Sequence, residues 1–105
     1  MQTSKNEILN FLGTLKRELN AEGITSLGLF GSIAKDKSTA DSDIDIVYRT
    51  SDTFIQTHKG WNAFTYLNTH LRNKIAHKFN VQVDMFDLNS SSALKEKIKN
   101  EAIYV

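Results

Sequence analysis

The stretch GLFGSIAKDKSTADSDIDIVY, residues 28–48, places a Gly-Ser pair at the end of one apolar run and two aspartates within the next. Side chains alternate across a strand, so Asp43 and Asp45 project from one face while Ile44 and Ile46 project from the other. The isoleucines then have a core to fill, and the two aspartates stand on the opposite side with Cα atoms about 6.5–7 Å apart. The chain must therefore build a sheet with one covered face and two acids together on the other.

Two carboxylates at this spacing repel each other unless a cation lies between them. Both can reach a hard, oxygen-seeking cation, and Mg²⁺ is usually held by one or two carboxylates plus substrate phosphates. The alternative is the solvent face of an edge strand, where charged side chains discourage pairing with another sheet. The Asp-x-Asp triplet alone does not decide between a metal site and such an edge.

The Gly31-Ser32 pair upstream favours the metal site. A glycine that ends a strand lets the backbone turn sharply and approach a ligand without a Cβ in the way. The amides that follow Gly31, at the start of a short helical turn, make a site for phosphate, and the Ser32 hydroxyl adds a donor. Gly-Ser is also a common turn dipeptide. Because it occurs here in one loop-linked pair of strands with Asp43 and Asp45, the stretch predicts a site for a metal nucleotide.

A third acid in the segment VQVDMFDL, residues 81–88, would complete such a site. Asp84 lies between Val83 and Met85, and an acid inside an apolar strand is costly unless it is paired, hydrogen-bonded or bound to metal. Asp87 is the competing acid, but it belongs to the opposite face near the strand end, where an exposed structural acid is the ordinary interpretation. We therefore predict that Asp84 joins Asp43 and Asp45.

Hydrophobic periodicity and capping signals predict the elements that carry these residues. A capping box at Ser4 and Glu7 begins the first helix and Gly23 ends it, while Ser92 caps the last. The long amphipathic helix is indicated by apolar residues three or four apart: Trp61, Phe64, Leu67, Leu71, Ile75 and Phe79. The predicted elements are a helix over residues 4–22, a strand over 24–30, a short helical turn, a strand over 44–48, a helix over 61–79, a strand over 81–88 and a last helix carrying Leu94, Ile98 and Ala102.

This order calls for a small sheet with helices packed on it, an α/β (α+β) fold in one domain over residues 1–105. Periodicity does not tell which strands are parallel. Hydrophobic residues make up 40% and charged residues 24% of the chain, as in a soluble globular protein. Its apolar runs are too short to span a membrane, and the N-terminus lacks the apolar block of a signal peptide. Without cysteine, disulfides and thiolate metal sites are excluded, and we expect a cytoplasmic location.

The net charge of +1 is too small to indicate direct nucleic-acid binding. Between Asp52 and Asp84 there is no acid, although bases and histidines gather there. A solvated helix face is the plainer interpretation, and a docking surface for phosphate or an acidic partner is the alternative. These residues are Lys59, Arg72, Lys74, Lys78, His58, His70 and His77, and the histidines lack the spacing of a zinc site. The aromatic residues Trp61, Phe64 and Phe79 are interpreted as core residues and not as an adenine platform.

The Gly31-Ser32 pair, ten intervening residues and Asp43-Ile44-Asp45 resemble the signature of the DNA polymerase β-like nucleotidyltransferase superfamily. With the later strand acid Asp84 and an ending of IKNEAIYV, the whole chain resembles a minimal nucleotidyltransferase (MNT) domain protein, the MntA-type antitoxin of HEPN/MNT toxin–antitoxin modules. The resemblance implies a mixed sheet flanked by helices, ATP and two Mg²⁺ ions as cofactors, and a partner HEPN-domain toxin. It also implies transfer of AMP to a hydroxyl, in relatives a tyrosine of the toxin.

Carried over by residue, the resemblance assigns the triphosphate to Gly31 and Ser32. Asp43 and Asp45 would bind metal, and Asp84 would complete the metal site and help to deprotonate the attacking hydroxyl. Many relatives follow Gly-Ser with Arg-Ala-Arg-Gly, whereas this chain has residues 33–36 as Ile-Ala-Lys-Asp. In this segment Lys35 could serve phosphate as a point charge, without the bidentate fork of arginine, while Ile33 has no charge and Asp36 adds a negative one.

Two other functions fit the same residues. A non-catalytic antitoxin would neutralise its toxin by binding alone, and the altered segment 33–36 favours it somewhat. A small-molecule nucleotidyltransferase, for instance one acting on an antibiotic, usually carries an added domain to hold the acceptor, and 105 residues offer none. We expect the acceptor to be another protein that brings its own surface.

Overall fold

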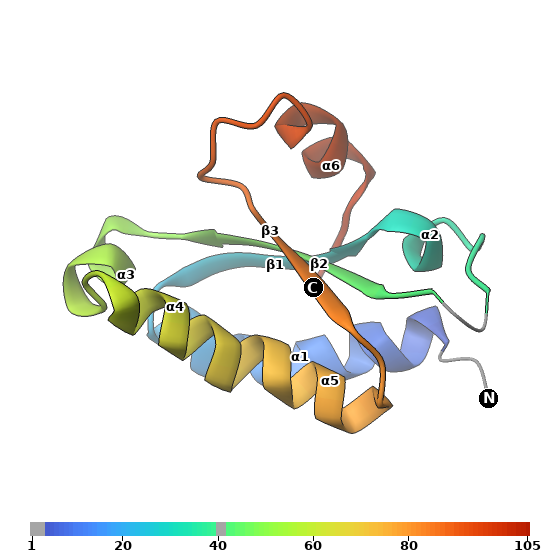
Figure 1. Cartoon of the computed structure of the whole chain (residues 1–105), viewed down its shortest axis with the longest axis horizontal. Coiled ribbons are helices and arrows are strands. Elements are labelled where there is room, and N and C mark those ends of the chain that lie inside the picture. Colours follow the sequence, from blue (N-terminus) through green and yellow to red (C-terminus); the bar gives the residue numbers. More distant parts are fainter. Residues whose placement is uncertain (1–3, 40–41) are drawn as a thin grey trace.

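The computed structural model describes residues 4–39 and 42–105, which form a four-stranded sheet with helices on both faces (Figure 1). The elements are α1 (Lys5–Ala21), β1 (Ile24–Phe30), α2 (Gly31–Ala34), β2 (Ile44–Thr50), α3 (Asp52–Thr57), α4 (Trp61–Leu67), a π-helical turn η1 (Asn68–Arg72), α5 (Asn73–Phe79), β3 (Val83–Asp87), α6 (Lys95–Glu101) and β4 (Ile103–Tyr104). No helix within the described ranges is long and apolar enough to cross a membrane.

The sheet is mixed, as the resemblance implies, with the strand order β3-β2-β1-β4. β1 runs antiparallel to both β2 and β4, and β2 runs parallel to β3. Parallel neighbours need a crossover connection, and the helices from α3 to α5 supply it. The acid-bearing strands β2 and β3 are therefore adjacent, although a long helical segment separates them in the chain.

The larger core lies between the sheet and the helices α1, α4 and α5, on the lower side of the sheet in Figure 1. α1 begins as predicted, since the Ser4 hydroxyl accepts a hydrogen bond of 3.1 Å from the amide of Glu7. It ends before Gly23, which has a φ of 105°. Each apolar side chain that α1 buries stabilises the fold by about 1.5–3 kcal/mol, and these are Ile8, Leu12, Leu15 and Leu19.

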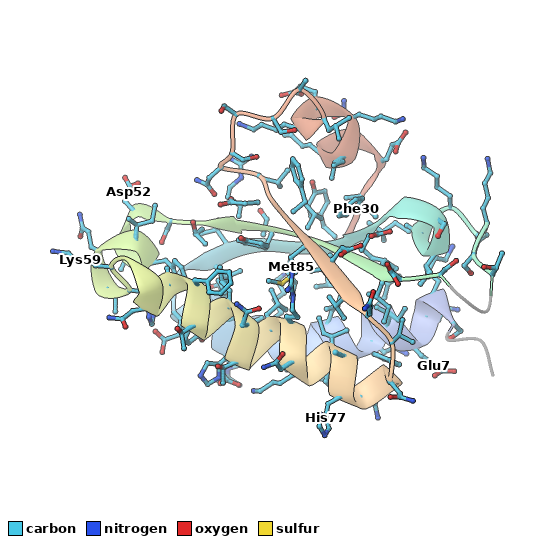
Figure 2. All side chains as sticks on the ribbon, in the orientation of Figure 1. Glu7, Phe30, Asp52, Lys59, His77 and Met85 are labelled. Atoms are coloured by element: carbon cyan, nitrogen blue, oxygen red, sulfur yellow. The ribbon has the colours of Figure 1, made fainter. Side chains whose placement is uncertain are left out.

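The opposite face of the sheet is covered only in part, by α6 (Figure 1). A smaller cluster of Val47, Leu88 and Ile98 is buried there, with Phe30 and Phe86 packed against it. The two phenylalanine rings meet edge to face with centroids 6.3 Å apart. Figure 2 shows Phe30 directed toward α6, whereas Met85 is directed toward the helices of the other face. The acids Asp43, Asp45 and Asp84 belong to the end of this face that α6 leaves accessible.

The sequence did not predict α3 or β4. α3 begins at Ser51, whose hydroxyl accepts from the amide of Phe54 at 3.2 Å, and Phe54 is its one buried residue. Six residues give too few turns for a periodic pattern. β4 spans two residues and pairs with β1 through Ile103 and Tyr104.

The predicted helix over residues 61–79 is interrupted by η1, and Phe64 is 59% exposed. The prediction that Phe64 is a core residue was wrong. In η1 the amide of Asn73 bonds to the carbonyl of Asn68, so the turn takes in an extra residue and shifts the apolar stripe. Leu71 and Ile75 then continue the stripe of Leu67 and leave Phe64 outside it. Phe79 is partly buried as predicted, while the side chain of Trp61 lies outside the described residues.

The last helix also begins later than predicted. The Ser92 hydroxyl accepts from the amide of Leu94 at 3.1 Å, but α6 starts at Lys95. Leu94 is 58% exposed, so its predicted place on the apolar face was wrong. Ile98 is buried as the spacing predicted, whereas Ala102, although partly buried, lies just after the helix, which ends at Glu101.

Candidate active site

Gly31 turns the chain from β1 into α2 with a φ of 79°, a left-handed conformation that favours glycine. Its Cα lies directly against Asp45. A Cβ placed at Gly31 would overlap the Oδ2 atom of Asp45 and would lie 2.9 Å from its Cγ. The absence of a side chain at position 31 thus makes room for an acid, and not only for a turn. The predicted link between the Gly-Ser pair and the Asp pair is a direct contact.

Asp45 and Asp84 are register partners in the parallel pair of β2 and β3. Neighbouring strands lie about 4.8 Å apart and register partners share a face, so these two carboxylates are adjacent. Asp43 precedes Asp45 by two residues and belongs to the same face. On the other face Ile44 and Ile46 are completely buried, as the alternation predicted. The fold therefore brings all three predicted acids to one end of one face.

This arrangement changes the pKa of Asp45. Its pKa is raised from 3.8 to about 6, first by burial, then by the negative charge of Asp84, and then by that of Asp43. A carboxyl group whose neighbours resist its ionisation gains most from a nearby cation. No cation among the described residues offsets these effects on Asp45, so the site suits a metal ion.

Asp84 is exposed, although its strand neighbours Val83 and Met85 are buried or partly buried. The prediction that Asp84 is an acid embedded in an apolar environment was therefore wrong. β3 is an edge strand of the sheet, so its outer side reaches solvent. The position of Asp84 follows from its register with Asp45 and not from burial.

In the parts of the chain that the structure describes, no three acidic or histidine side chains are grouped closely enough to enclose a metal ion. The acids therefore do not form a preformed cage. Mg²⁺ does not require one, because it keeps several waters and is commonly bound by one or two carboxylates together with substrate phosphates. The adjacent Asp45 and Asp84, with Asp43 on the same face, fit a metal that arrives with a nucleotide.

The amides at the start of α2 lie beside these acids, because Gly31 opens the helix and contacts Asp45. Amides in the first turn of a helix have no partner inside it and can donate to an anion. Ser32 is half-buried, and its carbonyl accepts from the amide of Lys37 at 2.9 Å. The assignment of Gly31 and Ser32 to phosphate remains a prediction.

The altered segment that follows Ser32 has a structural explanation at each position. Ile33 is 5% exposed and belongs to the core. Asp36 has a φ of 59°, a left-handed conformation in which aspartate is tolerated better than most residues other than glycine. Its carboxylate lies 2.9 Å from the Lys5 ammonium group, which offsets the negative charge.

Lys35 is held by an acid that the sequence did not indicate. Its Nζ atom lies 3.0 Å from Oε2 of Glu101, the last residue of α6. Both side chains are partly exposed, so the pair is weak and can exchange. Lys35 can therefore reach a phosphate only by leaving Glu101. Glu101 is far from Lys35 in the chain, and no local pattern could have predicted the contact.

Asp87, the competing acid, lies away from this group. It pairs in register with Tyr48, and its Oδ1 atom accepts from the amide of Asn89 at 2.7 Å. Burial and the charge of Asp87 raise the pKa of Tyr48 to about 12. Asp87 thus has a structural role at the end of β3.

A family model described as Polymerase beta, Nucleotidyltransferase matches residues 13–105 of this chain. No curated protein matches the chain. Among solved structures, the chain is similar to one described as a toxin-antitoxin with AMP-PNP. The likeness has 26% identity and a TM-score of 0.66, and it covers 90% of this chain and 69% of that chain.

Two further solved structures share the fold. One is described as a minimal nucleotidyltransferase, with 18% identity and a TM-score of 0.70 over 96% of this chain and 95% of that chain. The other is a mutant of the toxin-antitoxin MntA-HpeT, with 24% identity and a TM-score of 0.63 over 90% of this chain and 69% of that chain. At these identities the likeness shows the architecture alone.

Proposed function

The chain belongs to the polymerase β nucleotidyltransferase family, and on that premise we propose that it is a Mg²⁺-dependent antitoxin that transfers AMP to a partner toxin. The donor is ATP, and the acceptor is a tyrosine hydroxyl of a HEPN-domain protein. One observation carries the proposal: Asp45 contacts Gly31 and is the register partner of Asp84. The similar toxin-antitoxin structure described with AMP-PNP, an ATP analogue, supports both the nucleotide and the kind of partner. We propose that the reaction takes place in the cytoplasm, where ATP is available.

The proposed reaction is an in-line displacement at the α-phosphorus of ATP. The acceptor oxygen forms a bond to the α-phosphorus, the bond from that phosphorus to the bridging oxygen breaks, and pyrophosphate leaves. The amides after Gly31 and the Ser32 hydroxyl would orient the phosphates. Asp84 would accept the proton of the attacking hydroxyl, and its exposure allows a hydroxyl of another protein to approach it. Positioning of this kind supplies most of the rate in phosphoryl transfer.

Asp43 and Asp45 would hold the metal, with Asp84 completing its ligands. When bound, Mg²⁺ supplies positive charge that stabilises the attacking and leaving oxygens. Burial first, and then the negative charges of Asp84 and Asp43, raise the pKa of Asp45, and a cation at this position would offset all three effects. The protein's own contribution would be to keep these carboxylates beside a turn whose amides can donate to the phosphates.

The proposal predicts that a reading frame beside this gene encodes a HEPN-domain toxin. It is tested by incubating that gene product with the protein, ATP and Mg²⁺, and measuring the intact mass of the product. We expect a gain of whole AMP units on a tyrosine. The double variant Asp43→Asn with Asp45→Asn should reduce the rate at least a hundredfold, because metal and phosphate positioning are lost. Asp87→Asn is the matched control and should label at nearly the wild-type rate. Addition of AMP to the toxin by the double variant at the wild-type rate would contradict the proposal.

A second candidate is an antitoxin that neutralises its toxin by binding alone. The observation that favours it is the state of residues 33–36, where Ile33 is buried and Lys35 is paired with Glu101. Among the described residues, segment 33–36 therefore has no unpaired cation that could bind a triphosphate. Neutralisation that persists without ATP and with the Asp43→Asn, Asp45→Asn variant would support this candidate over AMP transfer.

A further inference from the structure

A cleft of about 520 Å³ lies on the α6 side of the sheet, away from the three acids. Residues from β1, β2, α6 and β4 line it together with Leu88. Its volume falls within the range of about 300–1,000 Å³ that is common for small-molecule sites. The lining residues are Ser26, Arg49, Leu88, Lys99, Asn100 and Tyr104.

Two cations line this cleft without an acid beside them. Across the described residues, no ion pair joins Arg49 or Lys99 to a carboxylate, and the lining itself contains no acid. Arg49 is half-buried, which strengthens its interaction with an anion relative to one in water. The guanidinium also lies near enough to Tyr104 to lower the pKa of its hydroxyl, against the larger effect of burial, which raises it. Two cationic side chains therefore line the cleft, and no ion pair among the described residues neutralises either of them.

The rest of the lining supplies polar groups and an apolar wall. The Ser26 hydroxyl and the Asn100 amide are donors. Tyr104 donates its own hydroxyl to the carbonyl of Lys99 at 2.9 Å, which fixes the ring against the backbone of α6. The Tyr104 ring is 42% exposed and offers a surface on which a flat or apolar group could pack, whereas Leu88 beneath the cleft is nearly fully buried.

The cleft is distinct from the candidate active site. Arg49 and Asp45 are on the same face of β2 but four residues apart, about 13 Å at the rise of a strand. The buried Val47 and Ile98 pack together between them. A ligand held by Arg49 and Lys99 would therefore not touch the acids.

We propose that this cleft binds a small phosphate monoester, with its phosphate on Arg49 and Lys99 and its body against the Tyr104 ring. A phosphate monoester carries a charge of about −1.5 to −2 at neutral pH. It therefore matches two cations better than a carboxylate, which carries a single negative charge. Arginine binds phosphate with two parallel hydrogen bonds and lysine acts as a point charge. The inference does not depend on AMP transfer, because none of these residues belongs to the acid site.

The test uses the whole protein without divalent metal, so that the acids do not recruit a nucleotide. AMP, inorganic phosphate and adenosine are each titrated to about 10 mM while amide chemical shifts are recorded. AMP should shift the amide resonances of Ser26, Asn100 and Tyr104 in a saturable way. Inorganic phosphate should shift the same resonances more weakly, and adenosine should shift none of them. AMP shifts confined to Gly31 and Ser32, or equal binding of adenosine and AMP, would overturn the proposal.

Variants assign the binding to the two cations. Arg49→Gln and Lys99→Gln should each weaken the binding of AMP at least about tenfold, because each removes a charge-assisted hydrogen bond to phosphate. Lys97→Gln is the matched control, because it removes a charge from the same helix without touching the lining. It should change affinity less than about twofold. Equal affinity in Arg49→Gln, Lys99→Gln and Lys97→Gln would mean that the cleft does not recognise phosphate.

Discussion

Single residues decide whether the site can exist, and Gly31 is the clearest case. Its φ of 79° and the overlap of any Cβ with the Asp45 carboxylate both exclude a side chain. We predict that Gly31→Ala lowers the free energy of unfolding by about 1–3 kcal/mol and displaces Asp45. Gly13→Ala is the control: position 13 is an exposed helix position with open space, and alanine there should stabilise by about 0.5–1 kcal/mol. Urea denaturation measures both, and equal effects would contradict this account of Gly31.

The raised pKa of Asp45 predicts how the free energy of unfolding depends on pH. Its folded pKa of about 6 exceeds the unfolded value of 3.8, so between these values the folded state binds more protons than the unfolded chain. The free energy of unfolding should therefore fall as pH rises through that window and level off above it. Asp45→Asn should remove much of this decline and be more stable than wild type at pH 7. Urea denaturation from pH 4 to pH 8 checks this, and an unchanged slope in the variant would count against the mutual repulsion of the acids.

At the scale of elements, α5 ends at a residue whose backbone conformation is unfavourable for any residue other than glycine. Asn80 terminates the helix with φ 53° and ψ 47°, the left-handed conformation that glycine adopts most readily. We predict that Asn80→Gly stabilises the protein by about 0.5–1 kcal/mol. Thermal or urea unfolding of the variant measures the gain. A loss of stability would show that the Asn80 side chain has a compensating role.

The C-terminal helix α6 reaches the candidate site through Glu101, which holds Lys35. Glu101→Gln should free Lys35 for phosphate and tighten the binding of an ATP analogue severalfold. Stability should change by less than about 1 kcal/mol, because the pair is partly exposed. Glu96→Gln, an exposed acid in the first turn of the same helix, is the control for charge alone. Isothermal titration of AMP-PNP with Mg²⁺ compares them, and equal affinities would remove Lys35 from the proposed phosphate site.

At the scale of the whole molecule, the sequence predicted what local patterns determine. Alternation placed Ile44 and Ile46 in the core, and the single-face pattern of Asp43 and Asp45 followed from it. The mixed sheet came from the resemblance, since periodicity could not assign strand directions. The position of Asp84 beside Asp45 depends on the crossover through α3, α4 and α5, which only the fold shows.

What the sequence missed depends on contacts between distant segments or on small departures from regular structure. The pairing of Lys35 with Glu101 joins α2 to the far end of the chain. The exposure of Phe64 results from one π-helical turn, which a 3.6-residue period cannot reveal. The exposure of Asp84 reflects its place on an edge strand. The Lys35–Glu101 pair and the exposure of Asp84 determine how accessible the site is, while the local patterns determine most of the residues that form it.

The central claim is that Gly31, Asp43, Asp45 and Asp84 form one metal–nucleotide site. Calorimetric titration of AMP-PNP into the protein, with and without Mg²⁺, tests it without a partner. We predict that binding requires Mg²⁺ and weakens at least tenfold in Asp43→Asn and in Asp45→Asn, whereas Asp87→Asn binds like wild type. Affinity that is unchanged by removal of Mg²⁺ and by either substitution would contradict the claim.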